Sequence, residues 1–81
     1  METDTKNIYK TKDLGEAAAI LVKKQKLLKI EREGKICWFV FPNAPTCLNI
    51  SSDFYLGKLS ANVREYYEAI NMLKKIIFSH S

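Results

Sequence analysis

The chain has 81 residues, of which 47% are hydrophobic and 27% charged, and its formal net charge is +4. A chain of this length forms one small domain at most, and its composition is typical of a folded, soluble domain. Its longest apolar run, residues 36–41, is far shorter than the roughly 20 residues of a membrane-spanning helix. These properties exclude a two-domain enzyme and a transmembrane helix. We expect a single domain over 1–81, with disordered tails at 1–5 and 79–81.

The N-terminus and the cysteines bear on the compartment. Residues 1–5 are polar and lack the basic start and apolar stretch of a signal peptide, which favours a cytoplasmic protein. Cys37 and Cys47 are the two cysteines, and their spacing fits neither a disulfide framework nor a zinc site. We therefore expect two reduced thiols and no metal.

The first elements in chain order are a strand and a helix. Residues 7–11 suit a short edge strand. Asp13 precedes Glu16 by three residues, the spacing of a capping box, which predicts that a helix begins there and that the Glu16 side chain reaches back to the cap. Lys23 and Lys24 would close the last turn of this helix. Its apolar stripe comprises Leu14, Ala17, Ala18, Leu21 and Val22.

A β-hairpin follows. Residues 26–32 alternate imperfectly and residues 36–41 are apolar throughout, with Glu33 and Gly34 as the expected two-residue turn. This turn would pair Ile30 with Cys37. Because side chains alternate across a sheet, one face would carry Leu28, Ile30, Cys37, Phe39 and Phe41, and the other Leu27, Lys29, Glu31, Ile36, Trp38 and Val40.

The C-terminal half is predicted to hold one helix. The prolines at 42 and 45 end the strand, and residues 46–58 are expected to be irregular and to lie against the sheet. Ser60, or Asn62 with Glu65 three residues later, would cap the final helix. The buried stripe of that helix would comprise Val63, Tyr66, Tyr67, Ile70, Leu73, Ile76 and Ile77.

These elements predict a small α/β (α+β) domain of order β-α-β-β-α. A strand that is apolar on both faces is usually central, so residues 36–41 belong in the middle of a three-stranded sheet. The strand order is then 1-3-2, a split β-α-β arrangement with two helices.

Residues that carry enzymatic chemistry are scarce in this chain. His80 is the single histidine and the penultimate residue, so no Ser-His-Asp arrangement can be assembled without it. The three glycines are isolated from one another, which excludes a glycine-rich phosphate loop. We expect a protein that is not an enzyme and has no cofactor and no small-molecule substrate.

A basic cluster and a tryptophan are the candidate binding residues. Lys23, Lys24, Lys26 and Lys29 lie within seven positions with no acidic residue between them. With Trp38 on the same sheet face as Lys29, and Tyr9 adjacent, these residues would neutralise phosphates and stack on a base. The competing interpretation is that the lysines form a solvated helix end and that Trp38 belongs to the core.

A protein-interaction or homodimerisation module is the alternative function. If no helix covers the Trp38 face of the sheet, Leu27, Ile36, Trp38 and Val40 would form an apolar patch of the kind that marks an interface. The exposed side of the last helix is the other candidate surface. Binding to phosphates weakens steeply as salt rises, whereas an apolar interface is less sensitive to salt, so the two functions can be separated by experiment.

Short segments along most of the chain carry a family resemblance. They are residues 8–14, residues 16–18, Leu28 with residues 30–34, residues 39–41, Tyr55 with Gly57, and residues 62–64 through Tyr67 and Ala69. In this order they resemble a family of short uncharacterised bacterial and phage-encoded domains, a domain of unknown function. The chain has Gln25-Lys26 where that family has a glycine after the first helix. The resemblance implies no activity or catalytic residue, and the phage association favours contact with nucleic acid.

Overall fold

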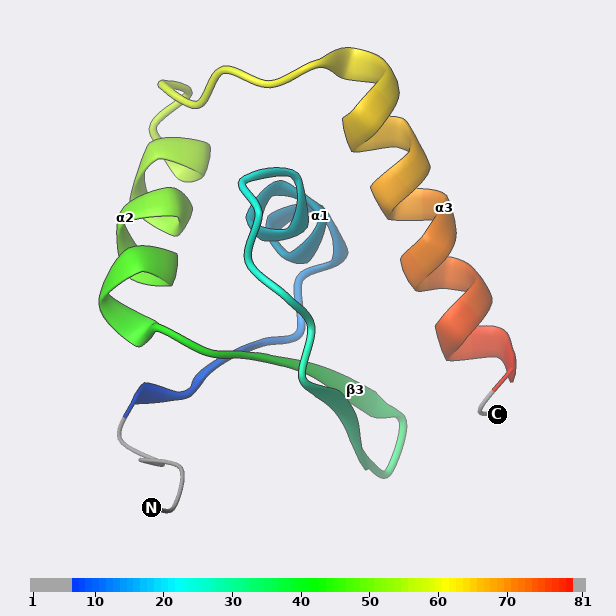
Figure 1. Cartoon of the computed structure of the whole chain (residues 1–81). Coiled ribbons are helices and arrows are strands. Elements are labelled where there is room, and N and C mark those ends of the chain that lie inside the picture. Colours follow the sequence, from blue (N-terminus) through cyan, green and yellow to red (C-terminus); the bar gives the residue numbers. More distant parts are fainter. Residues whose placement is uncertain (1–6, 80–81) are drawn as a thin grey trace.

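The computed structural model describes residues 7–79 and contains a three-stranded sheet and three helices. The elements are β1 (Tyr9–Thr11), α1 (Leu14–Val22), β2 (Lys29–Glu33), β3 (Ile36–Phe41), α2 (Ala44–Tyr55) and α3 (Val63–Ser79). The strand order is β1-β3-β2, and β3 is antiparallel to both neighbours. The predicted fold class and strand order are therefore confirmed. All three helices lie on one side of the sheet, with α1 between α2 and α3 (Figure 1).

The two predicted tails lie mostly outside the described residues. This applies to residues 1–5 and to 80–81, which include His80. Ser79, which we placed in the C-terminal tail, is instead the last residue of α3, and its hydroxyl donates to the carbonyl of Ile76 at 3.0 Å.

The hairpin turn lies one residue later than predicted. Glu33 pairs with Ile36, so the loop is Gly34-Lys35 rather than Glu33-Gly34, and Ile30 pairs with Phe39 instead of Cys37. Gly34 has a φ of +63°, and a two-residue turn with glycine first matches the twist of the flanking strands. The partner of each residue changes by two positions, which keeps the side chains of β2 and β3 on their predicted faces.

Helix α1 begins at the predicted cap and is buried on most of its surface. The Asp13 carboxylate accepts from the backbone N–H of Glu16 at 2.9 Å, as predicted. The Glu16 side chain, however, does not return to the cap: the Thr11 hydroxyl accepts from the Asp13 N–H at 3.1 Å and takes that role. Because α2, α3 and the sheet surround α1, burial exceeds the predicted stripe and includes Glu16, Ala17, Ala18, Ala19 and Ile20.

The two lysines after α1 lie outside its last turn, which corrects the prediction. Lys23 is the C-cap residue, and Lys24 has a left-handed φ of 75°. This backbone conformation favours glycine and ends many helices. Here a lysine adopts that conformation.

Helix α2 is the element that the sequence analysis missed, because residues 46–58 were expected to be irregular. Pro45 lies in its first turn, where proline is tolerated since the amide it lacks would have no partner within the helix. Four residues at helical spacing then face the core, namely Cys47, Ile50, Ser51 and Phe54.

Helix α3 packs mainly against α1, and Tyr66, Ile70 and Ile77 of its predicted stripe pack against the core. Asn62 is its cap, with its side-chain oxygen accepting from the Glu65 N–H at 3.0 Å, so Asn62 rather than Ser60 fills this role. Leu73 is the buried residue of α3. The prediction that Val63 and Tyr67 are buried is wrong: they are 82% and 64% exposed.

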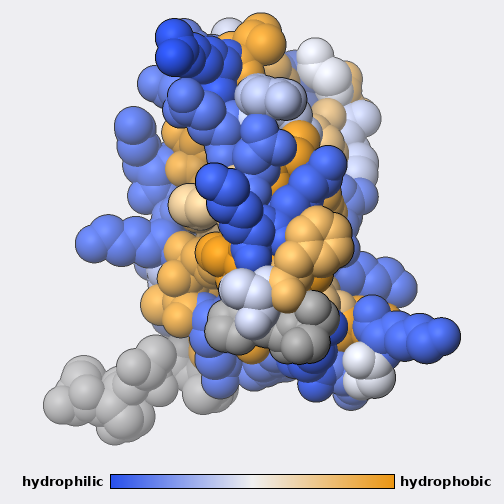
Figure 2. All heavy atoms as spheres, turned by 90° about the vertical axis from the view of Figure 1, so that its right-hand side faces the viewer, coloured by the Kyte–Doolittle hydropathy of each residue, from blue (hydrophilic) through white to orange (hydrophobic). Residues whose placement is uncertain are grey.

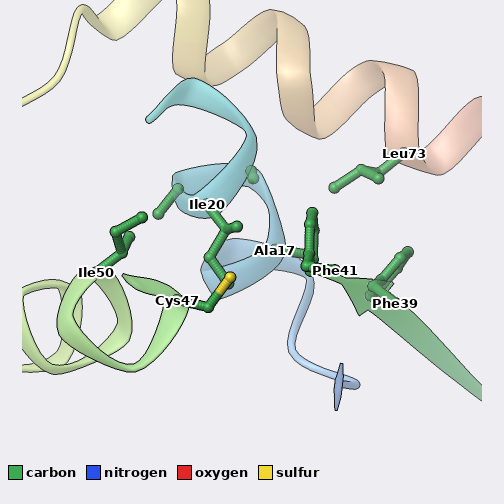
Figure 3. Close-up of a cluster of buried hydrophobic side chains, with 9 residues drawn as sticks. Ala17, Ile20, Phe39, Phe41, Cys47, Ile50 and Leu73 are labelled. Carbon is green, nitrogen blue, oxygen red and sulfur yellow. The ribbon is translucent and has the colours of Figure 1, made fainter. Parts of the chain in front are cut away.

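The core lies between the helices and one face of the sheet. Figure 3 shows side chains from α1, α2, α3 and β3 converging there. Phe39 and Phe41 supply its largest buried side chains, both from β3, and Ile20 and Leu73 meet them from the helices. Alternate residues of β3 therefore face this core, which leaves Ile36, Trp38 and Val40 on the opposite side of the sheet.

Candidate nucleic-acid interface

The side of the sheet that faces away from the helices, here called the open face, gathers lysines around Trp38. The strand register places Lys10 of β1 and Lys29 of β2 on either side of Val40, and Glu31 beside Trp38. The residues of the open face are Lys10, Lys12, Lys29, Glu31, Glu33, Ile36, Trp38 and Val40.

An ion-pair network crosses the open face. The Lys10 ammonium lies 2.8 Å from one carboxylate oxygen of Glu31, and the Lys29 ammonium lies 3.1 Å from the other. Because β1 and β2 flank β3, the Lys10 side chain must cross the central strand to reach Glu31. This crossing explains why Val40 is fully buried on a face without a helix. Hydrogen bonds from the two lysines lower the pKa of Glu31.

Trp38 lies beside this network, paired with Glu31 across the strands, and is half-buried. Its indole N–H donates to the Glu33 carboxylate at 3.1 Å, and the Lys12 ammonium lies 5.9 Å from the ring centroid, within the range of a cation–π contact. An open depression is lined here by Lys10, Glu31, Arg32, Glu33 and Trp38. The flat face of Trp38 therefore has one cation beside it, Lys12, and shares the open face with Lys10 and Lys29.

The structure separates the predicted basic cluster into two places. Lys29 and Trp38 share the open face as predicted, whereas Lys23, Lys24 and Lys26 follow α1. The Lys23 ammonium donates to the carbonyl of Ser60, which ties the end of α1 to the segment before α3. Lys24 lines a hollow with residues of α3 that include two glutamates, Glu65 and Glu68. Lys23 and Lys24 therefore lie near α3 and the segment before it, whereas Lys29 lies on the open face.

Sequence reasoning missed Lys10 and Lys12 and misplaced Tyr9. Alternation along β1 puts Lys10 on the open face and Tyr9 on the helix side, where Tyr9 pairs with Phe41. The antiparallel pairing of β1 with β3 was implied by the predicted strand order, so the register would have revealed both lysines. The predicted apolar patch does not form as proposed, because Leu27 packs against the core.

A second polar arrangement, here called the Glu16 clasp, lies on the helix side. It comprises Glu16, Tyr9, Thr11 and Tyr55. Glu16 is 3% exposed, and its carboxylate accepts hydrogen bonds from the hydroxyls of Thr11 at 2.6 Å, Tyr55 at 3.1 Å and Tyr9. The clasp joins β1, α1 and α2.

The chemistry of the Glu16 clasp keeps its hydroxyls protonated. Burial and the neighbouring Glu16 raise the pKa of Tyr9, and burial, the Glu16 charge and hydrogen bonds to Glu16 and Asp13 raise that of Tyr55. Burial also raises the pKa of the nearby Cys47 thiol, which donates to the Pro42 carbonyl at 3.2 Å. A protonated hydroxyl can donate to a carboxylate, so this arrangement suits a structural link rather than a reactive centre.

The remaining observations concern other kinds of site. Within residues 7–79, no three His, Cys, Asp or Glu side chains lie close enough together to bind a metal ion. In the same part of the chain, no helix has both the length and the apolar character needed to span a membrane.

Comparisons with protein-family models, curated proteins and solved structures find no match to this chain, so the resemblance to a phage-associated domain family stays a prediction.

Proposed function

We propose that this protein is a non-enzymatic binding module that contacts single-stranded nucleic acid through its open face. Trp38 stacks on a base, and Lys10, Lys12 and Lys29 contact the neighbouring phosphates. The observation that supports this proposal is that two lysines from one segment, Lys10 and Lys12, and Lys29 from β2 share with Trp38 the sheet face that no described helix covers. Lys23, Lys24 and Lys26 add positive charge farther away, which attracts the nucleic acid without contacting it.

A single strand fits this surface better than a duplex does. Stacking on an aromatic side chain requires an unpaired base, and it is worth about 1–3 kcal/mol per base. Lysine ammonium groups bind phosphates as point charges without reading the sequence, so we expect weak selectivity among bases. The open face therefore supports a general affinity for single strands.

Glu31 lowers the affinity of the open face for phosphate groups. Its carboxylate already bonds Lys10 and Lys29, so a phosphate must compete for both ammonium groups. These pairs are solvent-accessible, and exposed ion pairs contribute little stability, so they can exchange at small cost. The result is a weak, salt-sensitive interaction.

A protein contact through α3 is the other candidate. The exposure of Val63 and Tyr67 favours it. Figure 2 views the side of the molecule on which α3 lies and shows hydrophobic residues there separated by hydrophilic ones. The hydrophobic residues on this side are scattered, whereas the lysines and Trp38 share one face of the sheet. We therefore favour nucleic acid as the partner.

The test is a chemical-shift titration of the labelled protein with a thymidine oligonucleotide of about ten nucleotides, and with a duplex of equal length. Measured at about 50 and 200 mM salt, the shifts should cluster on the open face, weaken at the higher salt, and be larger for the single strand. Shifts confined to α3, or none at the lower salt, would contradict the proposal.

Two variants of equal charge locate the contact. Lys12→Gln with Lys29→Gln removes two positive charges from the open face, and Lys24→Gln with Lys26→Gln removes two from the segment after α1. For a single strand, each lost phosphate contact lowers the slope of log affinity against log salt by about 0.7. The first variant should therefore lose about 1.4 from the slope and the second much less. Equal losses in both variants would show general charge attraction without a site on the open face.

A further inference from the structure

Strand β2 is an edge strand: β3 pairs with one side of it, and no strand among residues 7–79 pairs with the other. In a hairpin with a two-residue loop, the residues that flank the loop exchange hydrogen bonds, so the backbone groups of Lys29, Glu31 and Glu33 point toward β3. The backbone N–H and C=O groups of the alternate residues, Ile30 and Arg32, then point outward. Such an edge is a template for pairing with another strand.

The side chains along this edge have a self-complementary order. Lys29 and Glu31 lie on the open face with opposite charges, and Ile30 lies between them on the helix side. Beside the edge is a hollow whose lining is mostly apolar, and one of its residues, Leu28, is 51% exposed. The hollow is lined by Leu27, Leu28, Lys29, Ile30, Arg32 and Ile76.

We propose that the β2 edges of two copies of this chain pair antiparallel about a two-fold axis at Ile30, which joins the two sheets into one of six strands. Ile30 then exchanges backbone hydrogen bonds with Ile30 of the partner subunit. On the open face, Lys29 lies opposite the partner's Glu31, and the symmetry repeats this contact.

The charges select this register over the neighbouring ones. Residues in a non-hydrogen-bonded antiparallel pair have Cα atoms about 4.5 Å apart, so Lys29 and the partner's Glu31 are close enough for an ion pair. An axis at Glu31 would instead place two glutamates opposite each other. Parallel in-register stacking would align lysine with lysine and disfavour open-ended aggregation.

The dimer would also enlarge the proposed binding surface. A two-fold axis between antiparallel strands of one sheet is perpendicular to that sheet, so both open faces and both Trp38 side chains lie on the same side. This consequence rests on the proposed function. One nucleic-acid strand could then contact two sites on a continuous surface, which raises its affinity for the dimer through effective concentration. The pairing itself involves no nucleic acid and can be tested without it.

The experiment is sedimentation equilibrium of the full chain from micromolar to millimolar concentration. For the unaltered protein, the mass should rise with concentration from 9.3 kDa toward twice that value. Lys29→Glu alone and Glu31→Lys alone should each stay monomeric, because each places like charges opposite each other. An equimolar mixture of the two variants should dimerise, since each pair across the axis then joins a lysine and a glutamate.

A second measurement identifies the register in the unaltered protein. In a mixture of isotope-labelled and unlabelled chains, the Hα atoms of Lys29 and of the partner's Glu31 should show an intermolecular nuclear Overhauser effect. A monomer up to millimolar concentration would overturn the proposal. So would self-association that both single variants retain, because the interface would then lie elsewhere, for example on α3. Neither result depends on whether the open face binds oligonucleotides, so the two proposals can fail separately.

Discussion

Glu16 and Glu31 are the centres of two polar networks that lie on opposite sides of the same sheet. Glu16 is buried and accepts hydrogen bonds from hydroxyl groups, whereas Glu31 lies on the open face between two lysines. A buried carboxylate that loses its partners is costly, but an exposed ion pair can exchange its partners with water or with a ligand. The Glu16 clasp therefore stabilises the fold, whereas the ion pairs of the open face can exchange their partners for a ligand.

The largest expected effect is on the free energy of unfolding, and it differs between the two glutamates. Glu16→Ala removes the common acceptor of three hydroxyl groups, and we expect the free energy of unfolding to fall by about 3 kcal/mol. Glu31→Ala should lower it by less than about 1 kcal/mol. Urea denaturation of both variants measures the difference. Equal losses would show that the buried network is no more important for stability than the exposed one.

Next in size is the effect of Trp38 on binding. Trp38→Leu preserves an apolar side chain but removes the stacking surface, and we expect affinity for a thymidine oligonucleotide to fall about tenfold. Trp38→Phe keeps a smaller aromatic face and should lose less. Fluorescence anisotropy of a labelled oligonucleotide gives both values, and Tyr55→Leu, on the helix side, is the control. Unchanged affinity in Trp38→Leu would remove stacking from the proposal.

A smaller effect concerns the Glu16 clasp at alkaline pH. The raised pKa values of Tyr9 and Tyr55 mean that the folded state retains protons that the unfolded state loses above pH about 10. Stability is therefore complete below this pH and declines as the pH rises through the folded-state values. Tyr55→Phe should cost about 1 kcal/mol at neutral pH and make the decline shallower. Thermal unfolding between pH 7 and pH about 11 tests this, with Tyr67→Phe on α3, outside the Glu16 clasp, as the control.

The smallest effect sharpens the role of Glu31. Glu31→Gln frees Lys10 and Lys29 from their carboxylate partner, so we expect oligonucleotide affinity to rise a few-fold and its salt dependence to steepen. Glu68→Gln on α3 changes the net charge equally and should have a much smaller effect. Titration of both variants at two salt concentrations makes the comparison. A loss of affinity in Glu31→Gln would mean that Glu31 organises the lysines for binding instead of competing for them.

Local patterns predicted the hairpin, the Asp13 cap and the final helix, because each signal lies within a few residues of the chain. The central position of β3 followed from its apolar character on both faces. Helix α2 was missed because Pro42 before it, Pro45 in its first turn and its polar residues resemble a loop, although the spacing of Cys47, Ile50 and Phe54 is helical. This spacing is the signal that a closer analysis of the segment would have used.

The candidate site was predicted only in part. Lys29 and Trp38 were assigned correctly to one face because alternation within a hairpin fixes it. Lys10 and Lys12 come from a distant segment, and only the pairing of β1 with β3 brings them beside Trp38. Lys23, Lys24 and Lys26 are close to Lys29 in sequence. The left-handed backbone of Lys24 and the hydrogen bond from Lys23 to the Ser60 carbonyl, however, hold the end of α1 near the segment before α3.

The sequence by itself determined the strands, two of the helices, the order of the sheet and the face of Trp38. The tertiary structure decided which polar residues meet. Glu16 accepts from three hydroxyls on two segments, β1 and α2, and Glu31 bridges lysines of both edge strands. The physical reason is that periodicity and capping depend on near neighbours, whereas these networks join groups that become close only when the sheet and helices pack.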